Sequence, residues 1–126
     1  MDYFFMTTER MYFCMDFIGG GSIERVLKEQ EIFLEQRIKF YAMQMIIALD
    51  ILHKNNIMHR DIKPDNLMID SEGYLKMIDF GLARILNPNQ LAYTQCGTPD
   101  YMSPEVVQGH NYSYSSEWWS VGIVIF

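Results

Sequence analysis

The 126-residue sequence has few of the features that mark secreted, membrane-spanning or nucleic-acid-binding proteins. Its two cysteines, Cys14 and Cys96, lie far apart and form no metal-ligand pair, which favours a reduced intracellular setting, with the cytoplasm as the first expectation. No apolar run reaches the ~18 residues that would span a membrane. The net charge of −6 argues against non-specific binding to nucleic acid. What remains is at most one small globular domain.

The hydrophobic pattern in the first half of the chain predicts two short strands and two helices. Residues 4–17 fit a pair of strands joined by a polar turn over 7–10. Ser22 stands where a helix N-cap belongs, with apolar residues at helical spacing behind it. Residues 35–54 carry apolar side chains at three- and four-residue steps, which predicts a long helix with one buried face.

The second half is predicted to be mostly loop and hairpin, with a helix at the end. Residues 67–69 and 74–78 indicate a hairpin across the turn at 70–73. Residues 82–99 show weak periodicity and are predicted to form a long exposed loop. Residues 117–126 are strongly apolar and are expected to form a buried helix.

Three motifs follow one another in this second half. They are His-Arg-Asp-Ile-Lys-Pro-Asp-Asn at 59–66, Asp-Phe-Gly at 79–81, and Gly-Thr-Pro-Asp-Tyr-Met-Ser-Pro-Glu at 97–105. In this order and at these spacings they resemble the catalytic loop, the metal-binding turn and the substrate-docking loop of eukaryotic-type protein kinases. The resemblance covers essentially the whole chain, but only about the middle half of a kinase domain.

This resemblance implies an α+β, protein-kinase-like fold in truncated form. Residues 1–18 would be a remnant of the N-terminal lobe strands and the hinge, and residues 19–126 an incomplete, mostly helical C-terminal lobe with short hairpins. The G-x-G-x-x-G phosphate loop and the V-A-I-K lysine of kinases do not occur in these 126 residues. The isolated chain is therefore expected to show little or no activity.

The same resemblance implies ATP and Mg²⁺ as cofactors and a set of catalytic residues. Asp61 would orient the acceptor hydroxyl and take its proton, and Lys63 would contact the transferred phosphate. Thr98 would bridge these two side chains. Asn66 and Asp79 offer the hard oxygen ligands that Mg²⁺ requires, and they are the expected metal ligands.

The substrate class follows from the residues around these positions. Lys63 and Thr98 resemble their counterparts in serine/threonine kinases, so a protein with a serine or threonine acceptor is the expected substrate. The sequences at 96–99 and 118–122, with the glycines after the hinge, are similar to those of the AGC group. Asp65 places one acidic residue near the expected peptide groove, which suggests a mild preference for basic substrates.

Adenine binding is expected at the segment that follows the second strand. Met15, Asp16 and Ile18 resemble the hinge that binds adenine, with Met15 as the gatekeeper. Met68 would close the lower face of the adenine. Simple core packing remains an alternative for each of the apolar residues.

Two further positions concern regulation and loop geometry. In kinases with an arginine at the position of Arg60, a phosphate on the activation loop binds that arginine; Thr94 is the expected acceptor for an activating kinase, and a solvated loop threonine is the alternative. Glu117 stands where kinases typically have Asp, and it is expected to reach back to the His-Arg-Asp turn with altered geometry.

Two functions stay open at this point. The first is a serine/threonine protein kinase, of which this chain is a fragment. The second is a truncated, non-catalytic kinase-like protein, either a binding module of the pseudokinase type or a pseudogene product.

Overall fold

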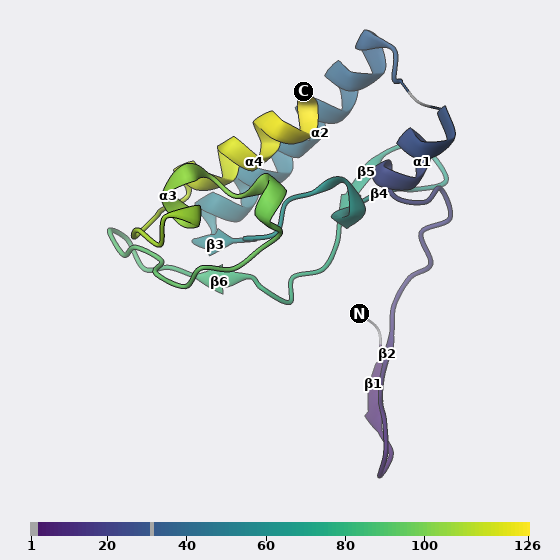
Figure 1. Cartoon of the computed structure of the whole chain (residues 1–126). Coiled ribbons are helices and arrows are strands. Elements are labelled where there is room, and N and C mark those ends of the chain that lie inside the picture. The colour runs from purple at the N-terminus through teal and green to yellow at the C-terminus, as the bar shows by residue number, and fades with distance from the viewer. Residues whose placement is uncertain (1–2, 31) are drawn as a thin grey trace.

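The computed structural model describes residues 3–30 and 32–126, and it shows an α+β arrangement of helices and two-stranded sheets (Figure 1). The first two residues of the expected N-terminal part, 1–18, lie outside the described residues. In chain order the elements are β1 (Tyr3–Met6), β2 (Met11–Cys14), α1 (Ile23–Gln30), α2 (Glu35–Lys54), β3 (Ile57–Met58), the 3-10 turn η1 (Pro64–Asn66), β4 (Leu67–Ile69), β5 (Leu75–Met77), β6 (Arg84–Ile85), the 3-10 turn η2 (Pro99–Tyr101), α3 (Pro104–Val107) and α4 (Ser115–Ile125).

The strands β1 and β2 form the N-terminal hairpin that the sequence predicts. They pair antiparallel, and the turn between them is closed by Thr7, whose Oγ1 accepts a hydrogen bond from the Arg10 amide at 3.1 Å. Every residue of both strands is exposed. Figure 1 shows the hairpin projecting away from the helices, so its stability rests on pairs within it, such as the stacked rings of Phe5 and Tyr12.

Helix α2 spans residues 35–54, as the apolar spacing predicts, and supplies the centre of the core. Tyr41, Met45 and Leu49 are buried along one face. Leu49 is fully buried in a cluster with Ile62 and Val121, which joins α2 to the loop after β3 and to α4. Figure 1 shows α4 running beside α2. The loop that holds Ile62 is therefore fixed between two helices.

The predicted hairpin over 67–78 is confirmed as β4 and β5, with Leu67 paired to Met77. The prediction of a long exposed loop over 82–99 is wrong in part. This segment contains β6, which pairs antiparallel with β3, and Leu86 and Ala92 are fully buried. The buried residues of this segment stand singly and far apart in the sequence, so they form no hydrophobic period that would predict their burial.

Helix α4 forms where a helix is predicted, but the expectation of a buried helix holds for one face only. Glu117 and Val121 are buried, whereas Trp118 and Trp119 are 40% and 48% exposed. The reason is that α4 packs on α2 along a single face. Within the described residues, none of the helices is both long enough and apolar enough to cross a membrane.

A close backbone contact joins the start of α1 to β4. The Gly20 amide donates to the Ile69 carbonyl at 2.9 Å, and the Ile69 amide donates to the Gly21 carbonyl at 2.8 Å. A Cβ atom on Gly20 would lie 2.4 Å from the Ile69 carbonyl oxygen. Glycine is therefore required at position 20, since any side chain would push the segment away from the strand.

Replacing Gly20 with alanine is expected to destabilise the protein by about 1–3 kcal/mol, because the added methyl group forces a backbone shift. Gly19→Ala is the matched control, since its nearest neighbour would lie at an ordinary 3.5 Å. Urea denaturation of the full-length protein with each substitution measures both. Equal unfolding midpoints for the two variants would contradict the close contact.

Candidate active site

The site is built on a strained turn between β3 and η1. Arg60 has a φ of 68°, in the left-handed region that residues other than glycine seldom occupy. The residue before it, His59, is fully buried; its Nε2 lies 3.0 Å from the Ile78 carbonyl, and its ring meets the edge of Phe80. The turn is thus anchored on one side by the chain that follows β5. Strain of this kind persists only where the surroundings hold it, and it is common at functional sites.

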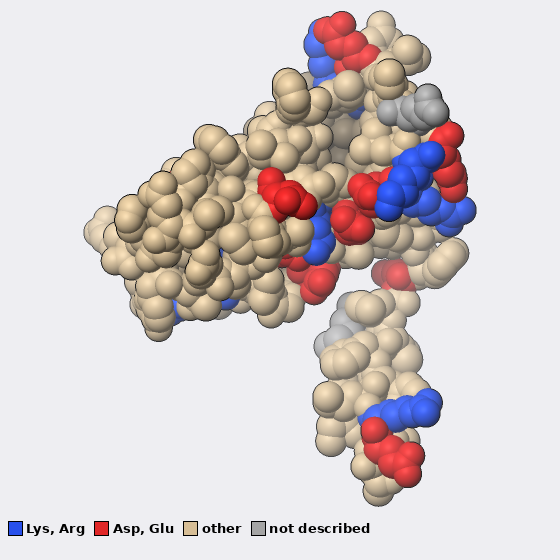
Figure 2. All heavy atoms as spheres, viewed as in Figure 1, with Lys and Arg blue, Asp and Glu red and all other residues tan. Residues whose placement is uncertain are grey.

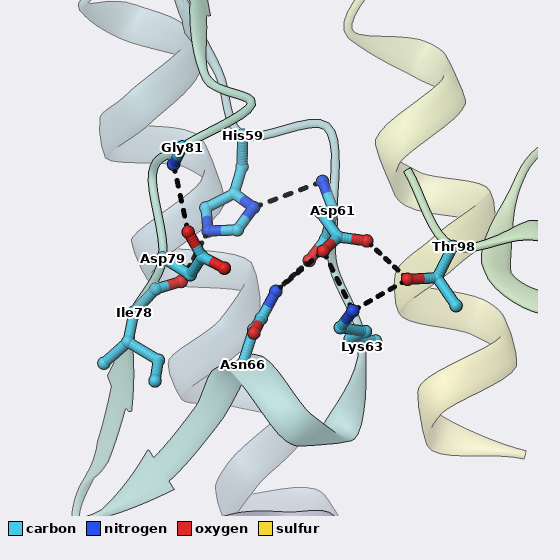
Figure 3. Close-up of polar contacts among 8 residues, drawn as sticks. All are labelled: His59, Asp61, Lys63, Asn66, Ile78, Asp79, Gly81 and Thr98. Carbon is cyan, nitrogen blue, oxygen red and sulfur yellow. Dashed lines mark hydrogen bonds and ion pairs between the residues drawn. The ribbon is translucent and has the colours of Figure 1, made fainter. Parts of the chain in front are cut away.

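Three of the predicted site residues meet at a fourth, Asp61 (Figure 3). Thr98 donates from Oγ1 to Asp61 Oδ1 at 2.7 Å, and Lys63 Nζ lies 3.0 Å from Asp61 Oδ2. Asn66 donates from Nδ2 to Oδ2 at 3.1 Å and to the main-chain carbonyl of Asp61 at 2.9 Å. Lys63 also donates to Thr98 Oγ1 at 2.8 Å, which closes the network. Both carboxylate oxygens of Asp61 are therefore engaged.

The network sets the charge of Asp61. Burial on its own would raise the pKa of this carboxyl group, but hydrogen bonds from Thr98, Lys63 and Asn66 and the charge of Lys63 outweigh it. The net result is a pKa below the ordinary aspartate value. Asp61 is consequently an ionised acceptor at neutral pH.

Thr98 reaches Asp61 because the residue before it is a glycine. Gly97 has a φ of 110°, and a Cβ atom there would lie 2.6 Å from the Arg60 carbonyl oxygen. The motif at 97–105 is therefore in close backbone contact with the His-Arg-Asp turn. Ser120 of α4 supports the same motif by donating to the Tyr101 carbonyl at 2.7 Å.

Asp79 lies beside this network without touching it. It has a φ of 60°, and its Oδ1 accepts a hydrogen bond from the Gly81 amide at 3.1 Å. Figure 3 shows it near Asn66, with no contact drawn between the two. In residues 3–30 and 32–126, no hydrogen bond engages Asp79 Oδ2 or Asn66 Oδ1.

These two oxygens fit a magnesium ion. They are hard donors, and the amide nitrogen of Asn66 is turned away toward Asp61. In the described part of the chain, no group of three or more His, Cys, Asp or Glu side chains forms a metal site. A cation here would take its remaining ligands from phosphates and water, as Mg²⁺ commonly does.

Glu117 reaches the His-Arg-Asp turn, as expected. Its Oε1 accepts a hydrogen bond from the Arg60 amide at 2.7 Å, and its Oε2 lies 2.7 Å from Nε2 of His53. Sequence reasoning assigned no role to His53. The only sequence signal was its place on the last turn of α2, one of many polar positions there.

The two predicted regulatory residues are not in contact. Arg60 donates from Nε to the Leu82 carbonyl at 2.7 Å, and its Nη1 is buried with no partner among the described residues. The side chain of Thr94 is exposed, while its carbonyl accepts a hydrogen bond from the Tyr112 hydroxyl at 2.6 Å. The backbone at Thr94 is thus held in place although its hydroxyl is open to solvent.

The predicted adenine-binding residues are only partly brought together. Ile18 and Met68 are half-buried, and Met68 pairs with Ser22 in an isolated β-bridge. Met15 is 67% exposed and Asp16 is also exposed. Both lie on the extended stretch that leads to the N-terminal hairpin (Figure 1), and neither forms a hydrogen bond or ion pair with the Asp61 network.

Acidic side chains gather near the network. The pKa of Tyr101 is raised, first by burial and then by the negative charges of Glu24, Asp65 and Asp100. Figure 2 shows acidic residues close together on this face of the molecule, with basic residues among them. The carboxylates of Glu24, Asp65 and Asp100 therefore lie near Tyr101, with Lys63 as an opposing charge.

Comparison with known proteins agrees with the geometry. The model of the protein kinase domain matches residues 1–126. The chain is 40% identical over its whole length to protein kinase 2 of Dictyostelium discoideum, 41% identical over its whole length to serine/threonine-protein kinase Sgk1 of Danio rerio, and 45% identical over 97% of its length to a cAMP-dependent protein kinase catalytic subunit of Arthrobotrys oligospora.

The chain spans 26%, 29% and 23% of the lengths of these three relatives. The match therefore concerns the kinase domain and not the whole of any relative. The AGC-like character inferred from the motifs around Gly97 and Trp118 is confirmed, as is the kinase-like fold. On the match across its whole length, the chain belongs to the protein kinase domain family.

Proposed function

We propose that this chain is part of a serine/threonine protein kinase that transfers the γ-phosphate of ATP to serine or threonine hydroxyls of proteins. The observation that supports it is the closed network of Asp61, Lys63, Thr98 and Asn66. Phosphoryl transfer needs little covalent chemistry from a protein, only alignment and neutralisation of charge. The network provides an oriented carboxylate next to a fixed cation.

Asp61 acts mainly by orientation. Its lowered pKa makes it a weak base, so it holds the acceptor hydroxyl through a hydrogen bond and takes the proton late, as the new bond to phosphorus forms. Lys63 has one donor to Thr98 and one to Asp61, which leaves a third for a phosphate oxygen. Thr98 keeps the carboxylate and the ammonium group in register.

Bound Mg²⁺ and ATP would supply the transferable phosphoryl group and neutralise its charge. Asn66 and Asp79 are the proposed metal ligands. Met15, Asp16, Ile18 and Met68 are the proposed adenine contacts. The proposed division is a hinge-bearing part at residues 1–18 and a C-terminal part at residues 19–126. Because the phosphate-loop and strand-lysine motifs of kinases do not occur in these 126 residues, and Met15 and Asp16 are exposed, the 126 residues alone are expected to transfer little phosphate.

The proposed substrate is a protein with basic residues near the acceptor. The negative charges of Glu24, Asp65 and Asp100 beside Tyr101 favour arginine and lysine in a bound peptide.

The proposed regulation is phosphorylation of Thr94 by another kinase. The buried, unpartnered Nη1 of Arg60 supports this regulation, because a phosphate would give that cation a strong acceptor.

The cytoplasm is the proposed location, in keeping with the free thiols of Cys14 and Cys96.

The full-length protein is expected to phosphorylate serine and threonine peptides with Mg-ATP, and Asp61→Ala should lower kcat by roughly 10²–10⁴-fold. A peptide array measures the acceptor and its neighbours in one assay. Asp50→Ala is the matched control, since this carboxylate pairs with Lys54 on the surface of α2. Enrichment of Arg or Lys near the acceptor is expected, and a flat array would contradict the basic preference. A folded protein that transfers no phosphate would favour the non-catalytic alternative.

Asp61 is expected to titrate below the ordinary value of about 3.9, and Thr98→Val should raise its pKa by removing a donor to the ionised form. Because the folded-state pKa is the lower one, the contribution of Asp61 to stability is present above about pH 4 and is lost as the pH falls through the folded pKa. Carbon-13 NMR of the Asp61 carboxyl measures both variants. Thr8→Val in the exposed hairpin is the control, and an unchanged Asp61 titration in Thr98→Val would contradict the network.

Phosphate is expected on Thr94 in the protein isolated from its own cells, and Thr94→Ala should lower activity on the order of tenfold, because a charge-assisted contact to Arg60 would be lost. Mass spectrometry locates the phosphate, and peptide kinase assays measure the effect. Tyr93→Phe serves as the control at the neighbouring exposed hydroxyl. Full activity of Thr94→Ala, with no phosphate found at this position, would refute the proposal.

A further inference from the structure

Residues 86–96, called the Thr94 segment below, follow β6 and are held by the part of the chain that joins α3 to α4. Ala92 and Tyr112 exchange two main-chain hydrogen bonds, at 2.8 and 2.9 Å, in an isolated antiparallel bridge. Gln95 adds a third contact, since its Nε2 donates to the Val107 carbonyl at 3.0 Å. Figure 1 shows the chain after β6 beside the chain after α3. The two parts are therefore joined at more than one point.

Two tyrosine hydroxyls tie down the Thr94 segment near its two ends. Tyr112 donates to the Thr94 carbonyl at 2.6 Å, and Tyr114 donates to the Leu86 carbonyl at 3.2 Å. The two donors are separated by a single residue, whereas their acceptors stand near opposite ends of the segment. Neighbouring donors thus fix the span between Leu86 and Thr94.

The Tyr112 hydroxyl is a buried donor. The residue is 5% exposed, and its ring packs in one cluster with the fully buried Leu86 and Ala92. Burial raises the pKa of the hydroxyl, against the lowering effect of nearby Arg60. The group is therefore protonated at neutral pH and can donate. Because apolar neighbours hold the ring, phenylalanine can replace Tyr112 with the loss of the oxygen alone, which leaves the Thr94 carbonyl without this donor.

The fixed carbonyl of Thr94 stands a few residues before the Asp61 network. Gly97 follows it, in close contact with the Arg60 carbonyl. Thr98 comes next and donates to Asp61 at 2.7 Å. A shift of the main chain at Thr94 would be passed along this short connection to Thr98. Because the Thr94 hydroxyl is exposed, it can accept a phosphate while its carbonyl stays bound.

We propose that Tyr112 and Tyr114 order the Thr94 segment in the absence of a phosphate, and that Tyr112 is thereby a positioning residue for Thr98. The effect on catalysis rests on the proposed kinase function, whereas the ordering of the segment does not. A phosphate on Thr94 would be a second anchor, at Arg60, for a segment that is already in place. Loss of the Tyr112 hydroxyl should therefore lower activity more without that phosphate than with it.

Hydrogen exchange in the full-length protein tests the ordering directly. The Ala92 amide, which donates to the Tyr112 carbonyl, reports the docking of the Thr94 segment. The Ile69 amide, which is bonded to the chain before α1, is the internal reference. Tyr112→Phe and Tyr114→Phe each remove one donor. Tyr74→Phe is the matched control, because that residue is exposed.

Tyr112→Phe is expected to speed exchange of the Ala92 amide on the order of tenfold, because a buried hydrogen bond is lost, with exchange of the Ile69 amide unchanged. Tyr114→Phe should act in the same direction with a smaller change, since its hydrogen bond is longer, 3.2 Å against 2.6 Å. Tyr74→Phe should match the wild type. Unchanged Ala92 exchange in both Tyr112→Phe and Tyr114→Phe would overturn the proposal.

Peptide kinase assays on the phosphatase-treated protein and on the protein phosphorylated at Thr94 test the positioning role. In the treated protein, Tyr112→Phe should lower kcat on the order of tenfold with KM within about twofold, and in the phosphorylated protein the loss should stay below about threefold. A merely structural role would give the same loss in both forms, and that result would overturn the positioning of Thr98. Faster Ala92 exchange in Tyr112→Phe, in a protein whose wild type transfers no phosphate, would support the ordering of the segment and refute the proposed kinase function instead.

Discussion

The geometry of the whole site depends on one hydrogen bond, from the Arg60 amide to Glu117. Arg60 has a backbone conformation that costs energy for a residue with a side chain, and the surrounding contacts must supply that energy. A buried carboxylate is itself costly unless it is paired and hydrogen-bonded. One hydrogen bond offsets part of both costs here, since the strained turn presents the amide that the carboxylate needs. His53 completes the arrangement from α2.

A second constraint aims the polar side chains of the loop. Ile62 is buried between α2 and α4, in contact with Leu49 and Val121. It stands between Asp61 and Lys63, and both of these side chains reach the same hydroxyl of Thr98. The burial of Ile62 therefore fixes the direction of the polar side chains beside it. With Ile62 held in the core, Asp61 and Lys63 both point to the opposite side of the segment, toward Thr98. The geometry of the polar network and the packing of the core are therefore properties of the same short segment.

The parts of the fold and of the site that are marked by a local sequence pattern could be predicted from the sequence. The bounds of α2 followed from apolar spacing, and the meeting of Asp61, Lys63, Asn66 and Thr98 followed from the kinase-like motifs. Three features could not be predicted: the burial of Leu86 and Ala92, the partial exposure of Trp118, and the contact of His53 with Glu117. Each depends on a partner distant in sequence, and a single side chain has no period that would reveal such a partner.

The contrast between Asp61 and Met15 shows what kind of contact fixes a site in this chain. Asp61 is held by residues 2, 5 and 37 positions away, and each of these is tied to a helix, a 3-10 turn or a close glycine contact. Met15 follows a hairpin whose pairs are internal, and the first backbone hydrogen bond from this stretch to the core, among the described residues, joins Gly20 to Ile69. Among the described residues, no backbone hydrogen bond ties the chain between β2 and Gly20 to the core. The proposed adenine contact of Met15 therefore requires order beyond that which positions Asp61.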